Sequence, residues 1–493
     1  MQESKNSYRQ VMKATSLFGG VQVFNILISI VKSKFVALWI GPAGYGIVTL
    51  FNTALNLVAG MTNLGLDQSA VKDISFSYNN EKPEGVARTI SILKRLVWFT
   101  AIIGALLMIV CSPWLSELAF ESNEYSFSFI WISIALLFKQ LSNGQLAILQ
   151  GLRKLKQLAK ANLYGNLLGL LISLPLYYFY RIDAIVPAII ISSFIAFIFT
   201  FYYLQKEKIE PAKLSNKEAF SEGKPMIQLG VVLSISSIIG LLVAYGIQIF
   251  ISQTGGVVQV GLYNAGFVIL NSYVGLIFNA MGTDYYPRLS AIIDKIEAIR
   301  KTVFEQAYIA ILLITPIVVL FLAAAPLIIV LLYTDEFTPI IEMVRWGILG
   351  MVFKAVSFSM GYIIIAKGDS KLFIKTAIGF NALLLVMNVL GYYYGGLEGL
   401  GISFLVYYFI HFIAIRIIVK SRYNFFFEKS FYAVFSICIL LCLASFLVTY
   451  IETSFIKYGA FVLLTLISII FSYIQLDKKM NIKELFSKVF KRK

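Results

Sequence analysis

The chain has 493 residues, of which 59% are hydrophobic and 14% are charged, and its mean hydropathy is +0.80. Soluble domains are about 45–50% apolar, so this composition excludes a soluble globular protein. The formal net charge of +16 would suit a nucleic-acid-binding protein, but the distribution of the basic residues, given below, argues against that class.

Apolar windows of about 20 residues, each long enough to cross about 30 Å of hydrocarbon, recur along the whole chain. They predict an all-α polytopic membrane protein with about fourteen transmembrane helices. In chain order the predicted helices are 14–38, 45–64, 96–119, 125–149, 162–180, 184–204, 226–252, 260–282, 304–333, 338–366, 372–394, 399–419, 430–450 and 455–476.

The basic residues alternate between the two sides of these helices. Of the 42 Lys and Arg, 35 lie in, or within three residues of, the two termini and alternate connections, and the opposite side has only Arg181 and Lys457. This asymmetry follows the positive-inside rule and predicts that both termini are cytoplasmic. The charge therefore orients the protein in a membrane and does not indicate a nucleic-acid partner. No cleavage site follows the first helix, so no removable signal peptide is expected.

The sequence repeats itself weakly at an offset of 215 residues. At this offset "LLFKQLS" (136–142) aligns with "MVFKAVS" (351–357), so that a lysine within one apolar helix falls on a lysine within another. The same offset pairs Gly41 with Gly256, Gly46 with Gly261, Asn56 with Asn271, Lys139 with Lys354, Lys156 with Lys371, Lys160 with Lys375 and Asn166 with Asn381. Many transporters consist of such repeats, and an even number of helices per repeat keeps both in one orientation. We therefore expect two parallel six-helix lobes.

The repeat and the charge runs predict five parts of the chain. They are an N-terminal lobe (1–204), a cytoplasmic linker (205–225), a C-terminal lobe (226–420), two further helices (421–476) and a basic amphipathic cytoplasmic tail (477–493). Connections between the helices are short, so no separate catalytic domain is expected.

The sequence contains no pattern typical of an enzyme. It has no glycine-rich phosphate-binding loop, a single histidine and three cysteines within apolar segments, which is too few for a disulfide framework or a metal site. We therefore expect neither catalysis nor a cofactor.

Five cations fall inside predicted helices and more than three residues from either end: Lys32, Lys34, Lys139, Arg345 and Lys354. An ionisable residue within a membrane generally faces the protein interior or water and marks a transport pathway. Because these cations outnumber the intramembrane carboxylates, we expect a positive central cavity that binds an anionic substrate. All five are candidate substrate-binding residues.

Two qualifications apply to this set. Lys32 and Lys34 are two residues apart, so they do not share one helical face. Arg345 follows Glu342 by three residues, and an ion pair between the two is an alternative to a role in binding. Asp67 and Asp284, near the inner ends of the second and eighth predicted helices, are candidates for ion coupling or gating.

Three segments of the sequence resemble the Wzx-type flippases of lipid-linked oligosaccharides, within the multidrug/oligosaccharidyl-lipid/polysaccharide exporter superfamily. They are "KATSLFGGVQVFNILISIVKSKFVALWIGPAGYGIVTLFNTALNLVAGMTNLGLDQSAVKDIS" (13–75), "QLAILQGLRKLKQLA" (145–159) and "GYIIIAKGDSKLF" (361–373).

The resemblance implies a fourteen-helix, two-lobe fold in the bacterial inner membrane. The implied substrate is an O-antigen or related oligosaccharide repeat unit on undecaprenyl pyrophosphate, and the implied partners are the lipid bilayer and the polysaccharide polymerase of the same pathway. The segment 29–41 also resembles the first helix of peptidoglycan-precursor flippases, in which a cavity-lining arginine falls at Lys32. A lysine there keeps the charge but lacks the bidentate fork of a guanidinium.

Three other functions are compatible with parts of the sequence. A drug or cation exporter of the same superfamily would need exposed carboxylates and aromatic residues in its lobes, and the excess of buried cations argues against it. A peptidoglycan-precursor flippase would share the headgroup and differ in the glycan. A membrane glycosyltransferase or polymerase would need acid–base residues and, in most cases, a sizeable outer loop.

Overall fold

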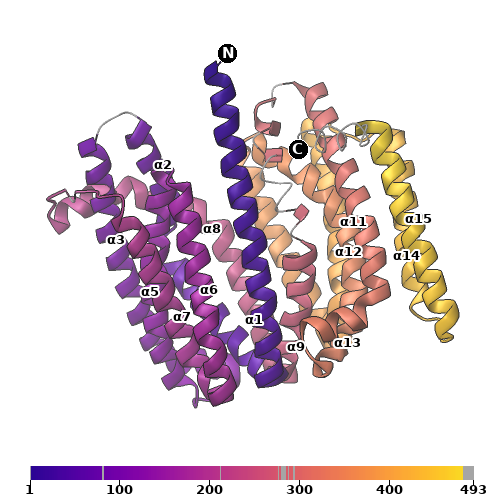
Figure 1. Ribbon diagram of the computed structural model, residues 1–493, viewed down its shortest axis with the longest axis horizontal. Coiled ribbons are helices and arrows are strands. Elements are labelled where there is room, and N and C mark those ends of the chain that lie inside the picture. The colour runs from indigo at the N-terminus through magenta and orange to yellow at the C-terminus, as the bar shows by residue number, and fades with distance from the viewer. Residues whose placement is uncertain are drawn as a thin grey trace. The chain divides into compact units, whose positions relative to one another are not determined.

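The computed structural model describes residues 2–79, 83–210, 212–275, 277–278, 285–286, 288–292 and 295–480. Within these residues the secondary structure is helical and contains no β-strand (Figure 1). The predicted all-α class is therefore confirmed. The candidate Asp284 and residues 481–493 of the predicted tail lie outside the described residues.

Eleven helical stretches of the described chain are long and apolar enough to span a membrane. Three of them, each longer than one crossing needs at 1.5 Å per residue, are interrupted. The first breaks at Gly41, the stretch Leu155–Gln205 at a short 3-10 turn, and the stretch Ser370–Tyr423 at Gly396. Counting the parts on either side of each break gives fourteen segments, the number predicted from the sequence.

The chain divides into two compact units, of which unit 1 comprises residues 1–261 and 332–334. Its helices are α1 (Gln2–Thr62), α2 (Leu66–Asn79), α3 (Pro83–Val110), α4 (Ser112–Phe120), α5 (Ser126–Gly151), α6 (Leu155–Tyr180), the 3-10 turn η1 (Arg181–Ala184), α7 (Ile185–Gln205), α8 (Asn216–Gly255) and the start of α9 (Val257–Val268). Helix α5 packs against α2, α3 and α7, and an apolar core that includes Leu66, Leu93 and Leu149 lies among them.

Unit 2 comprises residues 262–331 and 335–493. Its helices are the rest of α9, the π-helical turn η2 (Ile269–Val274), α11 (Ile296–Leu332, whose last residue clusters with unit 1), the 3-10 turn η3 (Asp335–Ile340), α12 (Ile341–Ala366), α13 (Ser370–Tyr423), α14 (Lys429–Val448) and α15 (Ser454–Met480). Helix α12 packs along α13 and also contacts α14, and α14 pairs with α15 (Figure 1).

The 215-residue repeat is visible in the backbone conformation. Residues with positive φ occur in pairs at this offset: Gly41 (φ 61°) with Gly256 (φ 83°), Arg153 (φ 56°) with Gly368 (φ 66°), and Arg181 (φ 52°) with Gly396 (φ 55°). A positive φ is uncommon outside glycine and marks a sharp change of chain direction. The three pairs show that equivalent helices end in the same local geometry in both halves of the sequence.

About half of the segment predicted as a linker (205–225) is helical. Helix α8 begins at Asn216, and the described part of residues 206–215 is irregular. The Ser215 hydroxyl accepts a hydrogen bond from the Glu218 amide (3.2 Å), and the Ser215 amide donates to the Glu218 carboxylate (2.7 Å). This reciprocal capping box starts the helix ten residues earlier than predicted. Arg88 of α3 pairs with Glu222 of α8, so α8 packs within unit 1. The lobe boundaries drawn from the repeat stay a prediction.

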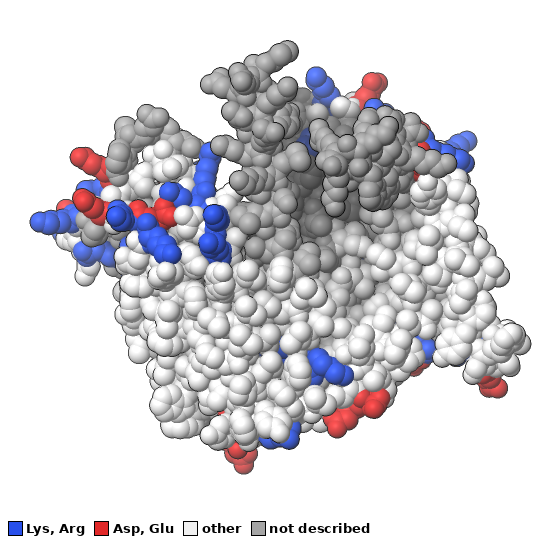
Figure 2. All heavy atoms as spheres, in the orientation of Figure 1, with Lys and Arg blue, Asp and Glu red and all other residues white. Residues whose placement is uncertain are grey.

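Charged side chains gather near the ends of the helices. In the view of Figure 2 the surface between these ends is almost free of Lys, Arg, Asp and Glu in each unit. A hydrocarbon environment selects such a band, because a charge at its centre costs about 2.5–3.5 kcal/mol on insertion scales. Lys139 and Lys354, described next, are charged residues that nevertheless lie in the middle of helices.

Candidate substrate-binding site

Lys139 lies in the middle of α5 and is partly buried within unit 1. Its ammonium donates a hydrogen bond to Oδ1 of Asn56, on the second part of α1. No carboxylate in the described part of the chain forms an ion pair with Lys139. Because an ammonium has three N–H donors, the bond to Asn56 leaves two of them for another acceptor.

A polar cavity of about 260 Å³ borders Lys139 within unit 1. Four elements contribute to its walls, namely the second part of α1, the start of α2, and helices α5 and α8. Its polar lining residues are Asn56, Asn63, Asp67, Gln68, Lys139, Gln140, Asn143, Ser234 and Ser237. Amide and ammonium N–H groups around one cavity can bind an anion, which is the chemistry expected from the sequence.

The cavity brings together two candidates that were predicted separately. Lys139 lines one wall, and Asp67, at the N-terminal end of α2, lines another. No hydrogen bond or ion pair joins the two side chains in the described structure, so each charge remains available to a ligand or an ion.

Gln140, the neighbour of Lys139, forms one side-chain hydrogen bond through its nitrogen, and its side-chain oxygen has no described donor. Its Nε2 donates to the Thr62 hydroxyl (2.6 Å), and that hydroxyl donates to the carbonyl of Val58 (2.8 Å). The Gln140 side-chain oxygen is buried without a hydrogen-bond partner among the described residues. A buried acceptor of this kind is satisfied by a donor from water or from a ligand.

Lys354 forms the equivalent bond in unit 2. It lies in the middle of α12, and its Nζ donates to Oδ1 of Asn271 in the π-helical turn η2 (2.9 Å). In both bonds the lysine and the asparagine are 83 residues apart in the sequence. The residues of the second bond lie 215 positions after those of the first. The repeat thus preserves a specific interaction between side chains as well as a fold.

The surroundings of Lys354 are aromatic. Its Nζ lies 5.6 Å from the ring centroid of Phe278 and 5.0 Å from that of Tyr408, within the range of cation–π attraction. No carboxylate among the described residues pairs with it. Lys354 is therefore held by one amide and two rings.

Arg345 lies on a different face of α12 from Lys354. The two are nine residues apart, which at 100° per residue places them on opposite sides of a straight helix. The Arg345 guanidinium forms an ion pair with Glu342, the alternative considered from the sequence, while its Nε is buried without a partner among the described residues. In the structure Arg345 therefore does not lie beside Lys354.

The two lysines of the first helical segment differ in their contacts. Lys34 donates a hydrogen bond to the backbone carbonyl of Tyr333, which belongs to unit 1. Lys32 is partly buried and has no hydrogen-bond or ion-pair partner in the described part of the chain. Of the two, Lys32 is the cation that remains unpaired.

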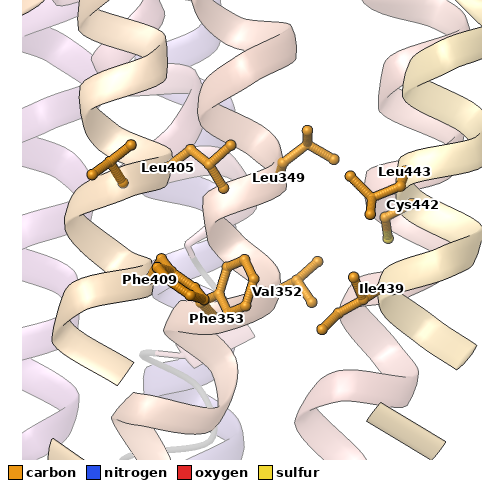
Figure 3. Close-up of a pocket in the computed structure, with 9 residues that line it drawn as sticks. Leu349, Val352, Phe353, Leu405, Phe409, Ile439, Cys442 and Leu443 are labelled. Atoms are coloured by element: carbon orange, nitrogen blue, oxygen red, sulfur yellow. The ribbon is translucent and has the colours of Figure 1, made fainter. Parts of the chain in front are cut away.

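The other face of α12 lines an apolar groove of about 310 Å³ in unit 2 (Figure 3). Leu349, Val352 and Phe353 of α12 line it with residues of α13 and α14, and Cys442 is its least apolar member. Such a lining offers nothing to a charged headgroup, so the groove is separate in character from the polar cavity of unit 1.

Sequence reasoning missed most of the uncharged polar residues of the cavity. Asn63, Asn143 and Ser237 carry no charge and lie within or beside apolar segments, where hydropathy does not single them out. Two signals were available: Asn143 follows Lys139 by four residues and so shares its helical face, and Asn56 aligns with Asn271 in the repeat.

The fold and the site together define a class of protein. The chain is a polytopic helical membrane protein made of two repeated halves, each with a lysine in mid-span, and no cluster of metal-binding residues occurs in the described part. Two solved structures share the fold. A lipid II flippase MurJ in an inward closed conformation has a TM-score of 0.65 at 14% identity, covering 96% of this chain and 100% of that one. An inward-facing multidrug resistance MATE family transporter of the MOP superfamily also has a TM-score of 0.65 at 14% identity, with coverages of 83% and 98%.

The chain belongs to the polysaccharide biosynthesis protein family, whose model matches residues 35–342. Among curated relatives, a Shigella flexneri protein named as a candidate O-antigen transporter is 23% identical over 357 residues, which is 70% of this chain and 82% of that protein. The lipid III flippase of Escherichia coli K12 is 21% identical over 364 residues, with coverages of 72% and 84%. The resemblance seen in the sequence is confirmed at the level of the family.

Proposed function

We propose that this chain is a flippase. It moves undecaprenyl-pyrophosphate-linked oligosaccharide repeat units, of O-antigen or a related polysaccharide, from the cytoplasmic to the outer leaflet of the bacterial inner membrane by alternating access. The observation that carries the proposal is the repeated lysine–asparagine bond, Lys139–Asn56 and Lys354–Asn271, which keeps one cation without a described carboxylate partner in each half. The names of the two relatives support the class of substrate.

The chemistry of the headgroup fits these lysines. A diphosphate presents several anionic oxygens, and each ammonium keeps N–H donors that its asparagine does not use. Charge-assisted hydrogen bonds from ammonium to phosphate are shorter and about twice as strong as neutral ones. Lys32, which has no described partner, is a further candidate for contact with the headgroup, and the asparagines position Lys139 and Lys354.

The membrane potential can drive the cycle. Undecaprenyl diphosphate carries roughly two negative charges, and moving one charge through 100 mV is worth about 2.3 kcal/mol. With the inside negative, each cycle moves these negative charges outward and returns the site to its starting position, so the cycle as a whole runs downhill. Coupling to an ion through Asp67, which shares the cavity of Lys139, is the alternative. Asp284, the other predicted coupling residue, lies outside the described residues.

The rival functions account less well for the same residues. A drug or cation exporter would bind its substrate with carboxylates, whereas Lys139 and Lys354 make both mid-span sites cationic. A glycosyltransferase or polymerase would need an acid–base pair beside a sugar site, and the cavity of unit 1 contains a single carboxylate, Asp67. A peptidoglycan-precursor flippase would use the same headgroup site, so only the glycan distinguishes it.

The orientation and the partner follow from the same proposal. Both termini face the cytoplasm, as the positive-inside rule predicts, and the translocated product is delivered to a polysaccharide polymerase at the outer leaflet. Reaction of single introduced cysteines with a membrane-impermeant thiol reagent tests the orientation: a cysteine at Lys457 should react from outside and one at Lys371 should not.

Flipping in proteoliposomes tests the function. Fluorescent undecaprenyl-pyrophosphate oligosaccharide is incorporated into both leaflets, and a membrane-impermeant reductant quenches the outer pool. Liposomes with the protein should allow nearly complete quenching, and protein-free liposomes should stop near half. Equal quenching in the two, or export of a cationic dye in place of the lipid, would contradict the proposal. Sugar incorporation on adding a nucleotide sugar would instead indicate an enzyme.

A further inference from the structure

The aromatic residues beside Lys354 continue as a row along one face of α12. Lys354, Phe358 and Tyr362 follow one another at intervals of four residues, so they lie on the same side of the helix. The rings of Phe358 and Tyr362 are 4.8 Å apart between centroids, Tyr286 lies 6.0 Å from Tyr362, and Phe278 lies 5.5 Å from Phe358. From Lys354 to Tyr362 the row is about 12 Å long at 1.5 Å per residue.

This face of α12 borders open space. Phe358 and Tyr362 are partly exposed and Tyr286 is 41% exposed, whereas Ala355 and Met360 on other faces of the helix are fully buried. A Cβ placed on Gly361, beside the row, would meet no atom within 4 Å. Lipid tails are an unsuitable neighbour, because the same face carries the ammonium of Lys354 at mid-span. The rings are therefore available to something that is neither core nor lipid tail.

The equivalent positions of unit 1 carry no rings. At the offset of 215 residues, Phe358 corresponds to Asn143 and Phe278 corresponds to Asn63, the two asparagines of the polar cavity. Tyr362 corresponds to Ala147. The two halves have thus kept the same lysine–asparagine bond while one surrounds it with amides and the other with aromatic rings. Packing requirements alone do not account for this, because the rings of unit 2 remain partly exposed.

We propose that the row of Phe358, Tyr362 and Tyr286 is a saccharide-binding subsite, on which the glycan of the substrate stacks while Lys354 takes part in binding the diphosphate. A pyranose ring has an apolar face of C–H groups, and the face of an aromatic ring carries partial negative charge that attracts such hydrogens. The tyrosine hydroxyls can hydrogen-bond to sugar hydroxyls at the edge. The proposal rests on the flippase function proposed above and assigns its glycan contacts to unit 2.

Binding of two lipid probes to the protein in nanodiscs separates the contribution of the headgroup to the affinity from that of the glycan. The probes are bare undecaprenyl pyrophosphate and the same lipid carrying three hexopyranoses. The wild type should bind the glycosylated lipid more tightly, because the sugars add contacts. The double variant F358L/Y362L keeps apolar volume but removes the flat rings, and should weaken binding of the glycosylated lipid by about tenfold. Its affinity for the bare lipid should stay within about twofold of the wild type.

Matched controls exclude a general loss of structure. F353L makes the same change of chemistry on the opposite face of α12, where Phe353 lines the apolar groove, and should leave both affinities unchanged. Thermal unfolding of each variant checks the fold, and the single variants F358L and Y362L replace the double variant if it unfolds early.

The outcomes distinguish the two proposals. If the wild type binds neither probe better than it binds phosphatidylglycerol, the flippase function fails and the subsite fails with it. If the wild type binds both probes and F358L/Y362L weakens them equally, or weakens neither, the subsite is overturned while the headgroup site stands. A selective loss of the sugar-dependent part of the affinity supports the subsite.

Discussion

The two mid-span lysines occupy equivalent places in the repeat but different chemical surroundings. Lys139 faces a polar cavity with Asn63 and Asn143, and its partner Asn56 sits in the regular helix of α1. Lys354 lies between the rings of Phe278 and Tyr408, and its partner Asn271 sits in a π-helical turn. Such turns are rare and occur frequently at functional sites.

The difference separates what the two halves must share from what each can change. The cation and its amide partner are present in both, which suits the proposed headgroup, whose charge is always the same. The residues around them diverge from amides to rings, which suits the proposed substrate, whose diphosphate and glycan would have different surfaces. A site that bound only an anion would need no rings, and a site that bound only sugar would need no lysine.

The largest expected effect comes from replacing Asn143 of unit 1 by phenylalanine, the residue at the equivalent position 358 of unit 2. Asn143→Phe would fill much of the 260 Å³ cavity beside Lys139 and remove an amide. We expect flipping and binding of bare undecaprenyl pyrophosphate to fall by roughly a hundredfold, since both access and charge-assisted hydrogen bonds are lost. Asn143→Ser, which leaves the cavity open, is the control. Normal binding by Asn143→Phe would exclude this cavity as a headgroup site.

Removing the amide partners should give a smaller and symmetrical effect. Asn56→Ala and Asn271→Ala each delete the one acceptor that positions a lysine. A hydrogen bond to a charged group contributes about 1.5–3 kcal/mol, part of which the free ammonium recovers by hydration, so affinity for the bare lipid should fall about threefold to tenfold. Isothermal titration calorimetry in detergent measures the affinity of each variant for bare undecaprenyl pyrophosphate. A loss confined to one of the two variants would show that the halves do not contribute equally.

Lysine-to-arginine changes should separate the two surroundings. The guanidinium of Lys354→Arg can stack on the rings of Phe278 and Tyr408, so flipping should stay within about twofold of the wild type. Lys139→Arg places a larger planar group in a cavity shaped by amides, and we expect a loss of about threefold. The comparison fails if Lys354→Arg is the more damaging of the two.

The smallest effect is expected at Arg345. Its ion pair with Glu342 is of the i, i+3 kind, which stabilises a helix by about 0.2–0.5 kcal/mol. Arg345→Ala should therefore change flipping by less than about twofold and lower the thermal midpoint slightly. A large loss of flipping in a stable Arg345→Ala protein would support the predicted role of Arg345 in substrate binding.

The sequence predicted the helical class and the number of crossings for physical reasons, because apolar windows report membrane crossings directly. A lysine inside such a window is conspicuous, so Lys139 and Lys354 could be selected as candidates without a structure. The start of α8 was missed because Ser215 and Glu218 form a capping box within a charged segment that resembles a linker. Asn143 and Phe358 could have been assigned from their helical spacing to the lysines, whereas residues such as Asn63 and Phe278 become part of a site only through tertiary contacts.

The central claim is that both lysines bind the headgroup, and flipping by Lys139→Ala and Lys354→Ala tests it most directly. The two variants are reconstituted at equal abundance with the wild type, and the rate of flipping of labelled undecaprenyl-pyrophosphate oligosaccharide is measured beside thermal unfolding. We expect each variant to flip about tenfold or more slowly with an unchanged thermal midpoint, since no described carboxylate is left unpaired. Wild-type rates in both variants, or slow rates that accompany early unfolding in both, would contradict the claim.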